Sequence, residues 1–363
     1  MAEDKKTELK IGASRHFTSW LGSHNLSIAI STYQANKLFL IGRKDDGAMS
    51  IFERTFQRPM GIAVSPDANT LVLATQYQIF RFDNVLPPGQ KADDLYDRLY
   101  CPHNSWITGD LDIHDIGIDA EKTPSFVATR FSCIGEVSEG HSFRPLWQPP
   151  FISQLVAEDR CHLNGMATKN GKPAFATAAS RSDTAEGWRD GRVSGGLLID
   201  VETGAILLDG LSMPHSPRWH DGRLYLLNAG TGEFGWFDAE AGEFRPICFC
   251  PGYARGLSFH DGFAAIGISL PRENATFSGL PLEDGLRERD AEPRCGVLIV
   301  DIESGTIANW LRIEGIVTEL FDVTFLPATA CPSAIGFKSD EILHVISIDD
   351  GGTQRKADSV GRS

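Results

Sequence analysis

The stretch His162-Leu-Asn-Gly-Met-Ala167 decides the fold, because its pattern recurs along the chain. In each copy a short apolar strand contains a small residue, begins at or beside a polar residue, and leads through a turn to a second strand. The other copies are Arg58-Pro-Met-Gly-Ile-Ala-Val64, His114-Asp-Ile-Gly-Ile118, His215-Ser-Pro-Arg-Trp219, Arg255-Gly-Leu-Ser-Phe259 and Phe321-Asp-Val-Thr-Phe325. Neighbouring copies are roughly 40 to 65 residues apart, and a four-stranded propeller blade needs about 40 to 50 residues. Six copies therefore predict six blades.

The segments between these copies are also typical of β-structure. Short apolar runs alternate with turn signals such as Asp221-Gly222 and Asp261-Gly262, a pattern found in sandwiches, barrels and propellers. A second repeat, an apolar strand that ends in Asp and turns at Gly, resembles the outer hairpin of a propeller blade. Its copies are Gly196-Leu-Leu-Ile-Asp-Val-Glu-Thr-Gly204, Gly235-Trp-Phe-Asp-Ala-Glu-Ala-Gly242 and Val297-Leu-Ile-Val-Asp-Ile-Glu-Ser-Gly305. We predict an all-β, six-bladed β-propeller, with seven blades as the alternative.

One domain is expected to span residues 14–348. Strands near 26–41 precede the first copy and strands near 334–348 follow the last, so we expect the two ends to complete one shared blade and close the ring without open edges. Residues 1–13 are predicted to be flexible, and the polar tail 349–363 to be disordered. Loop insertions are predicted at 83–112, 138–160, 181–194 and 271–294.

Composition narrows the partners and the location. The chain has 34 Lys and Arg against 48 Asp and Glu, a formal charge of −14, which argues against nucleic acid and against membranes as partners. The start, MAEDKKTELKIG, is charged and lacks a signal-peptide core, so we expect a cytoplasmic protein. The chain has no P-loop or dinucleotide-binding glycine motif in the required context, and no nucleotide cofactor is expected.

The motifs also resemble a known family. The segments Ser31-Thr-Tyr-Gln-Ala-Asn-Lys-Leu38, His162-Leu-Asn-Gly-Met-Ala167, Met213-Pro-His-Ser-Pro-Arg-Trp-His-Asp-Gly-Arg-Leu224 and Tyr253-Ala-Arg-Gly-Leu257 are similar to those of DUF4915, a bacterial family of unknown function. The resemblance covers roughly residues 14–348 and implies a β-propeller-like protein, without supplying catalytic residues. More distantly, the blades resemble those of the strictosidine-synthase and gluconolactonase group, whose acidic calcium set is missing here.

The repeat itself predicts a site. The innermost strand of each propeller blade begins at one end of the central channel, so residues at equivalent repeat positions converge there. These residues are Arg58, His114, His162, His215, Arg255 and Asp322. His114, His162 and His215 could hold Zn²⁺, Fe²⁺ or Mn²⁺, and His162, His215 and Asp322 are the predicted catalytic residues. Metal-free acid–base chemistry and a purely structural role for the histidines remain open alternatives.

A ligand is also implied by the arginines. We predict that a small anionic metabolite or a peptide binds here, because guanidinium groups bind carboxylate and phosphate. The predicted ligand-binding residues are Arg58, Arg255, Asn164, Arg130, Arg181 and Trp106. The alternative is that the arginines pair with acids such as Asp119, Asp183 or Glu319. We therefore expect ligand binding or metal-assisted catalysis of hydrolase, lyase or oxygenase type. A non-enzymatic scaffold for a protein or peptide is the competing hypothesis.

Overall fold

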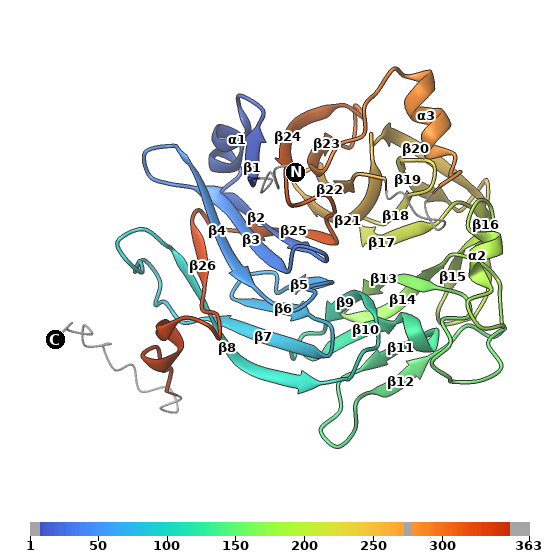
Figure 1. Ribbon diagram of the computed structural model, residues 1–363, viewed down its shortest axis with the longest axis horizontal. Helices are drawn as coiled ribbons and strands as arrows, with labels where there is room; N and C mark the ends of the chain where they lie inside the picture. The colour runs from blue at the N-terminus through green and yellow to red at the C-terminus, as the bar shows by residue number, and fades with distance from the viewer. Residues whose placement is uncertain (1–7, 272–277, 349–363) are drawn as a thin grey trace, which may run out of the picture.

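The computed structural model describes residues 8–271 and 278–348. These residues form six sheets that surround a central axis, antiparallel throughout except for one short parallel pairing (Figure 1). The prediction of a six-bladed β-propeller is therefore confirmed. Each sheet is one blade, and its first strand in the order below lies nearest the axis.

Six groups of four strands make the blades. The first blade consists of β25 (Asp322–Pro327), β2 (Leu26–Thr32), β3 (Lys37–Arg43) and β4 (Met49–Thr55). The second consists of β5 (Ile62–Val64), β6 (Thr70–Ala74), β7 (Gln78–Asn84) and β8 (Arg98–Ile107). The third consists of β9 (Ile113–Ile118), β10 (Pro124–Ala128), β11 (Cys133–Glu136) and β12 (Arg144–Trp147). The fourth blade consists of β13 (Leu163–Lys169), β14 (Lys172–Ala178), β15 (Gly196–Asp200) and β16 (Ile206–Leu211). The fifth consists of β17 (Pro214–His220), β18 (Arg223–Asn228), β19 (Glu233–Asp238) and β20 (Glu243–Phe249). The sixth consists of β21 (Tyr253–His260), β22 (Phe263–Ser269), β23 (Gly296–Asp301) and β24 (Ile307–Glu314).

The two ends of the chain close the ring, as predicted. Strand β25, from the C-terminal part, pairs with β2 in the register Ile30↔Val323 and supplies the innermost strand of the first blade. Strand β1 (Lys10–Ala13) pairs with β24 on the outside of the last blade. The N-terminal segment is thus held in two neighbouring blades, and residues 10–13 form a strand where a flexible segment was predicted.

The closing strand itself was misplaced in the prediction. It is β25, which contains the last repeat copy, whereas residues 332–348 add the short β26 (Pro332–Ala334), parallel to β8, and the 3-10 helix Asp340–Leu343. The predicted insertions at 83–112 and 138–160 contain the outer blade strands β8 and β12. Strand β12 is largely exposed and β8 is buried only at Tyr100 and Cys101, so both lack the apolar run that identifies an inner strand.

The remaining elements are short. They are α1 (Phe17–Ser23), α2 (Trp188–Gly191) in the 181–194 segment, α3 (Leu282–Glu288) in the 271–294 segment, and the 3-10 helix Thr129–Phe131. Part of the predicted insertion, 272–277, lies outside the described residues, as do the predicted flexible residues 1–7 and the tail 349–363. No helix in the described parts of the chain is long and apolar enough to cross a membrane.

Polar clasps join the innermost strands of neighbouring blades. Asp115 accepts a hydrogen bond from the backbone N–H of Met166 (3.0 Å), one blade further on. Asp322 accepts one from Ile62 N–H (2.8 Å), and Ser216 accepts one from Gly256 N–H (3.0 Å). A buried N–H without a partner is costly, so these side chains fix how the blades fit together around the channel.

Gly256 shows why the innermost strand of the repeat contains a small residue. Its φ is +82°, and a Cβ placed there would lie 2.5 Å from the backbone nitrogen of Val323 in the next blade. Gly262 has a similar φ of +79° but open space around its Cβ position. Gly256→Ala should therefore lose more stability than Gly262→Ala, whose cost of about 1 kcal/mol or more comes from the backbone alone. Urea unfolding of both variants measures the difference, and equal losses would contradict this packing argument.

Candidate functional site

One residue from each blade reaches the same end of the channel. We call these six residues the axial ring, and they lie near the start of each innermost strand: Arg58, His114, His162, His215, Arg255 and Phe321. Phe321, beside the predicted Asp322, represents the blade that the two chain ends complete. Two of the six, Arg58 and His162, have left-handed backbone (φ 48° and 49°). Such strain in residues other than glycine is concentrated at functional sites.

Direct contacts link the axial ring around the axis. The imidazole of His114 lies 4.9 Å from that of His162 and 6.4 Å from that of His215, between ring centroids. The Arg255 guanidinium lies 3.4 Å from His215 Nε2 and 4.5 Å from the centre of the Phe321 ring. Three histidines far apart in sequence are thus neighbours, as the repeat indicated.

Tyr33 completes the circle between Phe321 and Arg58. Its ring stacks on Phe321 with centroids 5.6 Å apart. The Arg58 guanidinium lies 4.4 Å over the Tyr33 ring and also donates a hydrogen bond to its hydroxyl. Because the phenol is buried, the pKa of Tyr33 is raised, and the hydroxyl stays protonated at neutral pH.

The three imidazoles share one hydrogen-bonding arrangement. His215 Nδ1 lies 2.8 Å from the carbonyl oxygen of Met213, and His114 Nδ1 lies 3.0 Å from that of Asp112. His162 Nδ1 lies 2.8 Å from a carboxylate oxygen of Asp159. Each of these partners accepts a hydrogen bond, so each Nδ1 carries a proton, and in the neutral imidazole Nε2 then carries the lone pair.

Burial keeps two of these histidines uncharged. It lowers the pKa of His114 to about 4, and it lowers the pKa of His215 well below its ordinary value, with Arg255 adding to the effect. Both imidazoles are therefore neutral at physiological pH. A neutral Nε2 can accept a proton or bind a metal ion, whereas a protonated one can do neither.

His162 belongs to a carboxylate–histidine pair that a tryptophan holds in place. Asp159 Oδ2 accepts hydrogen bonds from His162 Nδ1 and from Trp188 Nε1 (2.9 Å). The Trp188 ring, 2% exposed, stacks on the His162 imidazole with centroids 4.1 Å apart. A carboxylate on Nδ1 fixes the tautomer and stabilises the imidazolium, which is the arrangement of a general base.

The axial ring is not the positively charged site that the arginines suggested. Arg58 lies within ion-pair distance of Asp110 (3.7 Å) and Asp112 (3.8 Å). Arg130 pairs with Asp110 at 3.1 Å, and Arg255 with Glu319 at 3.6 Å. Three arginines thus face four carboxylates, counting Asp159, so the site has mixed charge.

The other predicted site residues lie below the axial ring, on its rim or away from it. Asn164 accepts a hydrogen bond from Thr177 (2.9 Å), and Asp322 serves as the blade clasp described above. Arg130 lies on the rim beside Asp110. Arg181 lies over Phe151, 6.0 Å from its centre, and Trp106 is in the outer strand β8, packed on the core.

The sequence alone did not identify Tyr33, Asp110, Asp112, Asp159 and Phe321 as site residues. Two of them carry a local signal that could have found them, because Asp112 and Asp159 stand two and three residues before a ring histidine. Tyr33 has no such signal, because it follows β2, the second strand of its blade, and does not stand beside an innermost strand.

The Arg218 side chain lies in the channel beneath the axial ring. Its guanidinium binds both oxygens of Asp115 (2.7 and 3.0 Å) and also donates to the carbonyl of Leu257 (3.0 Å). A cavity of about 290 Å³, lined by all six innermost strands, lies at this level and toward the other end. The ion pair between Arg218 and Asp115 therefore lies directly beneath the axial ring.

No three His, Cys, Asp or Glu side chains in residues 8–271 and 278–348 are arranged to hold a metal ion. Arg255 also lies against His215 Nε2, where a metal ion would have to bind. The metal site formed by His114, His162 and His215 thus stays a prediction.

Comparisons with known proteins agree with this fold. A chain of a nidogen–laminin complex is 13% identical, with a TM-score of 0.53 over 84% of this chain and 99% of that one. A protein of unknown function from Bacteroides caccae (11% identity, TM-score 0.48, 83% and 98% covered) and a streptogramin B lyase (11%, 0.39, 78% and 74%) are more weakly similar. No curated protein matches in sequence. The model of the domain of unknown function DUF4915 matches residues 15–335, and the chain belongs to this family.

Proposed function

We propose that the axial ring binds a small organic acid that also carries a hydroxyl or amino group, and that His162 acts on it as a general base. Unused hydrogen-bonding atoms are the observation that supports this most. Five buried polar atoms of the ring and its neighbours have no hydrogen-bond partner among the described residues: Arg58 Nε, Asp110 Oδ1, Asp159 Oδ1, Asn164 Nδ2 and Arg255 Nε. Buried polar groups are nearly always paired, so a concentration of unpaired ones favours a polar ligand.

The kinds of unpaired atoms define the ligand class. Arg58 Nε and Arg255 Nε are donors, which match the oxygens of a carboxylate or another acidic group. Asp110 Oδ1 and Asp159 Oδ1 are acceptors, which match a hydroxyl or an ammonium group. A hydroxy acid or an amino acid offers both, whereas a simple carboxylate offers only the first.

The chemistry would begin with a proton transfer to His162. Its Nε2 lone pair takes a proton from the ligand or from a water molecule, and the Asp159 carboxylate stabilises the imidazolium that forms. Trp188 and Asp159 keep the imidazole in the required orientation. This step is common to lyases and hydrolases, two of the three classes expected from the sequence. The stacking of Trp188 on His162 favours a small ligand over a protein partner, because this tryptophan is not available on an outer surface.

A binding assay tests the ligand class. Thermal-shift measurements with glycerate, malate and serine should raise the melting temperature more than succinate or phosphate does. Arg130→Gln, on the exposed rim, should change this response less than Arg58→Gln, in the ring. A response that is equal for all five compounds, or unchanged in Arg58→Gln, would contradict the proposal.

A metal-assisted reaction is the second candidate. The observation that favours it is the fixed Nδ1–H of all three histidines, because metal-binding imidazoles commonly donate this hydrogen to a carbonyl or carboxylate. Elemental analysis of untagged protein separates the two proposals. Stoichiometric Zn, Fe or Mn that is lost in a folded His162→Ala/His215→Ala variant would favour the metal.

A further inference from the structure

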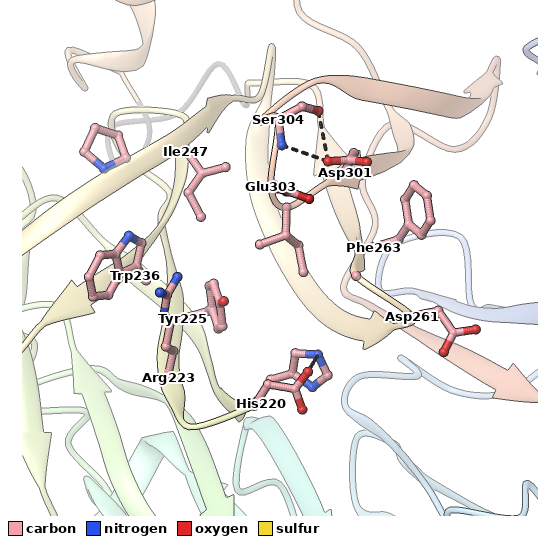
Figure 2. Close-up of a pocket in the computed structure, with 15 residues that line it drawn as sticks. His220, Arg223, Tyr225, Trp236, Ile247, Asp261, Phe263, Asp301, Glu303 and Ser304 are labelled. Atoms are coloured by element: carbon pink, nitrogen blue, oxygen red, sulfur yellow. Dashed lines mark hydrogen bonds and ion pairs between the residues drawn. The ribbon is translucent and has the colours of Figure 1, made fainter.

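A second crevice lies between the blade β17–β20 and the blade β21–β24 (Figure 2). Its volume is about 690 Å³, within the range of small-molecule sites. Strand β17 runs from His215 in the axial ring to His220 in the crevice, so the two sites are separated by roughly 15 Å of extended chain. None of the axial-ring residues lines the crevice.

Some of its carboxylates are explained by the fold. Asp301 Oδ1 accepts hydrogen bonds from the backbone N–H (2.8 Å) and the hydroxyl (2.9 Å) of Ser304, and the same Asp-x-Glu-x-Gly turn occurs at Asp200 and Asp238. Gly305 lets the two blades touch, since a Cβ there would lie 2.6 Å from the carbonyl oxygen of Ile247. The turn alone is therefore no sign of a ligand.

Tyr225 is not explained in this way. The side chain is only 5% exposed, and its ring packs on Phe234 and Phe259. Its hydroxyl has no hydrogen-bond partner among the described residues, and it lines the crevice, where Figure 2 shows the side chain beside the open space. The hydroxyl is not among the buried unpaired atoms of the described residues, so it faces the open crevice and can form a hydrogen bond with a ligand there.

The charges of the crevice indicate the kind of ligand. Four carboxylates line it, those of Asp221, Asp261, Asp301 and Glu303, against a single arginine, Arg223. The guanidinium of Arg223 lies 4.9 Å over the ring of Trp236, so the charge of this arginine is held against the aromatic wall. An excess of negative charge in a concave site attracts cations.

We propose that this crevice binds a small organic cation, an ammonium or guanidinium group on a short aliphatic stem. The carboxylates of Asp301 and Glu303 would neutralise the charge, and the Tyr225 hydroxyl would accept a hydrogen bond from an N–H of the ligand. The source of the cation is either a free amine or a basic side chain of a peptide. This proposal is independent of the function proposed for the axial ring.

Calorimetric titration of the full-length protein tests it with three probes. Agmatine represents the free cation, Nα-acetyl-arginine methylamide presents the same guanidinium as a peptide does, and butyrate is the anionic control. We expect saturable binding of at least one cation with a dissociation constant near or below about 1 mM, weakened by added salt, and none of butyrate. Preference for the second probe would identify a peptide side chain as the source.

Two conservative variants decide whether the crevice is responsible. Tyr225→Phe removes only the unpaired hydroxyl, so the unfolding midpoint should not fall, while affinity should drop about 5- to 10-fold. Glu303→Gln should weaken binding similarly, and Tyr77→Phe, a half-exposed tyrosine elsewhere, should leave it unchanged. Absence of saturable cation binding, or wild-type affinity in Tyr225→Phe, would overturn the proposal.

Discussion

Arg218→Met is expected to lower the free energy of unfolding by about 3–5 kcal/mol, the usual cost of removing one partner from a buried ion pair. Arg218, 22% exposed toward the channel cavity, binds both oxygens of Asp115, whose side chain is 3% exposed. Methionine fills much of the same space but leaves a buried carboxylate without its counter-ion. Arg218 also joins β17 to the carbonyls of Met166 and Leu257 in the two flanking blades, so the loss should extend across the ring. Chemical denaturation followed by tryptophan fluorescence measures it.

Two further variants make the Arg218 result specific. Arg144→Met removes a surface arginine, 69% exposed, from its pair with Glu136, and should change stability by less than about 1 kcal/mol. The double variant Arg218→Met/Asp115→Asn removes the uncompensated charge and should recover part of the loss. A loss of stability for Arg218→Met no larger than that for Arg144→Met would refute the claim that the Arg218–Asp115 pair stabilises the channel.

His162→Gln is expected to reduce turnover of the organic acid by about 10²- to 10⁴-fold, the usual contribution of a general base. Glutamine retains a polar side chain of similar length but cannot take up a proton. Asp159→Asn should reduce turnover as well, because an amide at this position no longer fixes the Nδ1–H tautomer or stabilises the imidazolium.

A structural role for His162 would give a different result. Turnover would then fall only as far as the folded fraction falls, so circular dichroism and unfolding curves accompany each rate. The control is His220→Gln, because His220 lies at the far end of its strand, stacked on Phe259. Wild-type turnover in a folded His162→Gln variant would remove His162 from the mechanism.

The repeat predicts most of the architecture because blade geometry ties local sequence to position. A polar residue ahead of an inner strand must reach the axis, and this correctly brings His114, His162 and His215 together. The outer strands β8 and β12 escape such an analysis, since their exposed faces accept almost any side chain. The prediction places the closing strand too late in the sequence because it treats Phe321-Asp-Val-Thr-Phe325 only as the last copy of the repeat and not as the strand that pairs with β2.

The chemistry of the site is less predictable than its position. Sequence spacing identifies Arg58 and Arg255 but cannot show that Asp110, Asp112 and Glu319 come within ion-pair distance of them. The same limit applies to Asp322, which is predicted to be catalytic because of its equivalent position in the repeat. Its carboxylate instead accepts the backbone N–H of Ile62 from the next blade, and burial raises its pKa to about 7.

The protonation of the three ring imidazoles is the central claim of this account, and long-range ¹H–¹⁵N correlation spectra of ¹⁵N-histidine-labelled protein measure it directly. Single-residue variants, His114→Gln, His162→Gln and His215→Gln, assign the signals. We predict that all three imidazoles carry the proton on Nδ1 at pH 7.5, and that His114 and His215 remain neutral at pH 5.5, because burial lowers the pKa of each. An Nε2–H tautomer at His162, or imidazolium signals for His114 and His215 at pH 7.5, would contradict the account.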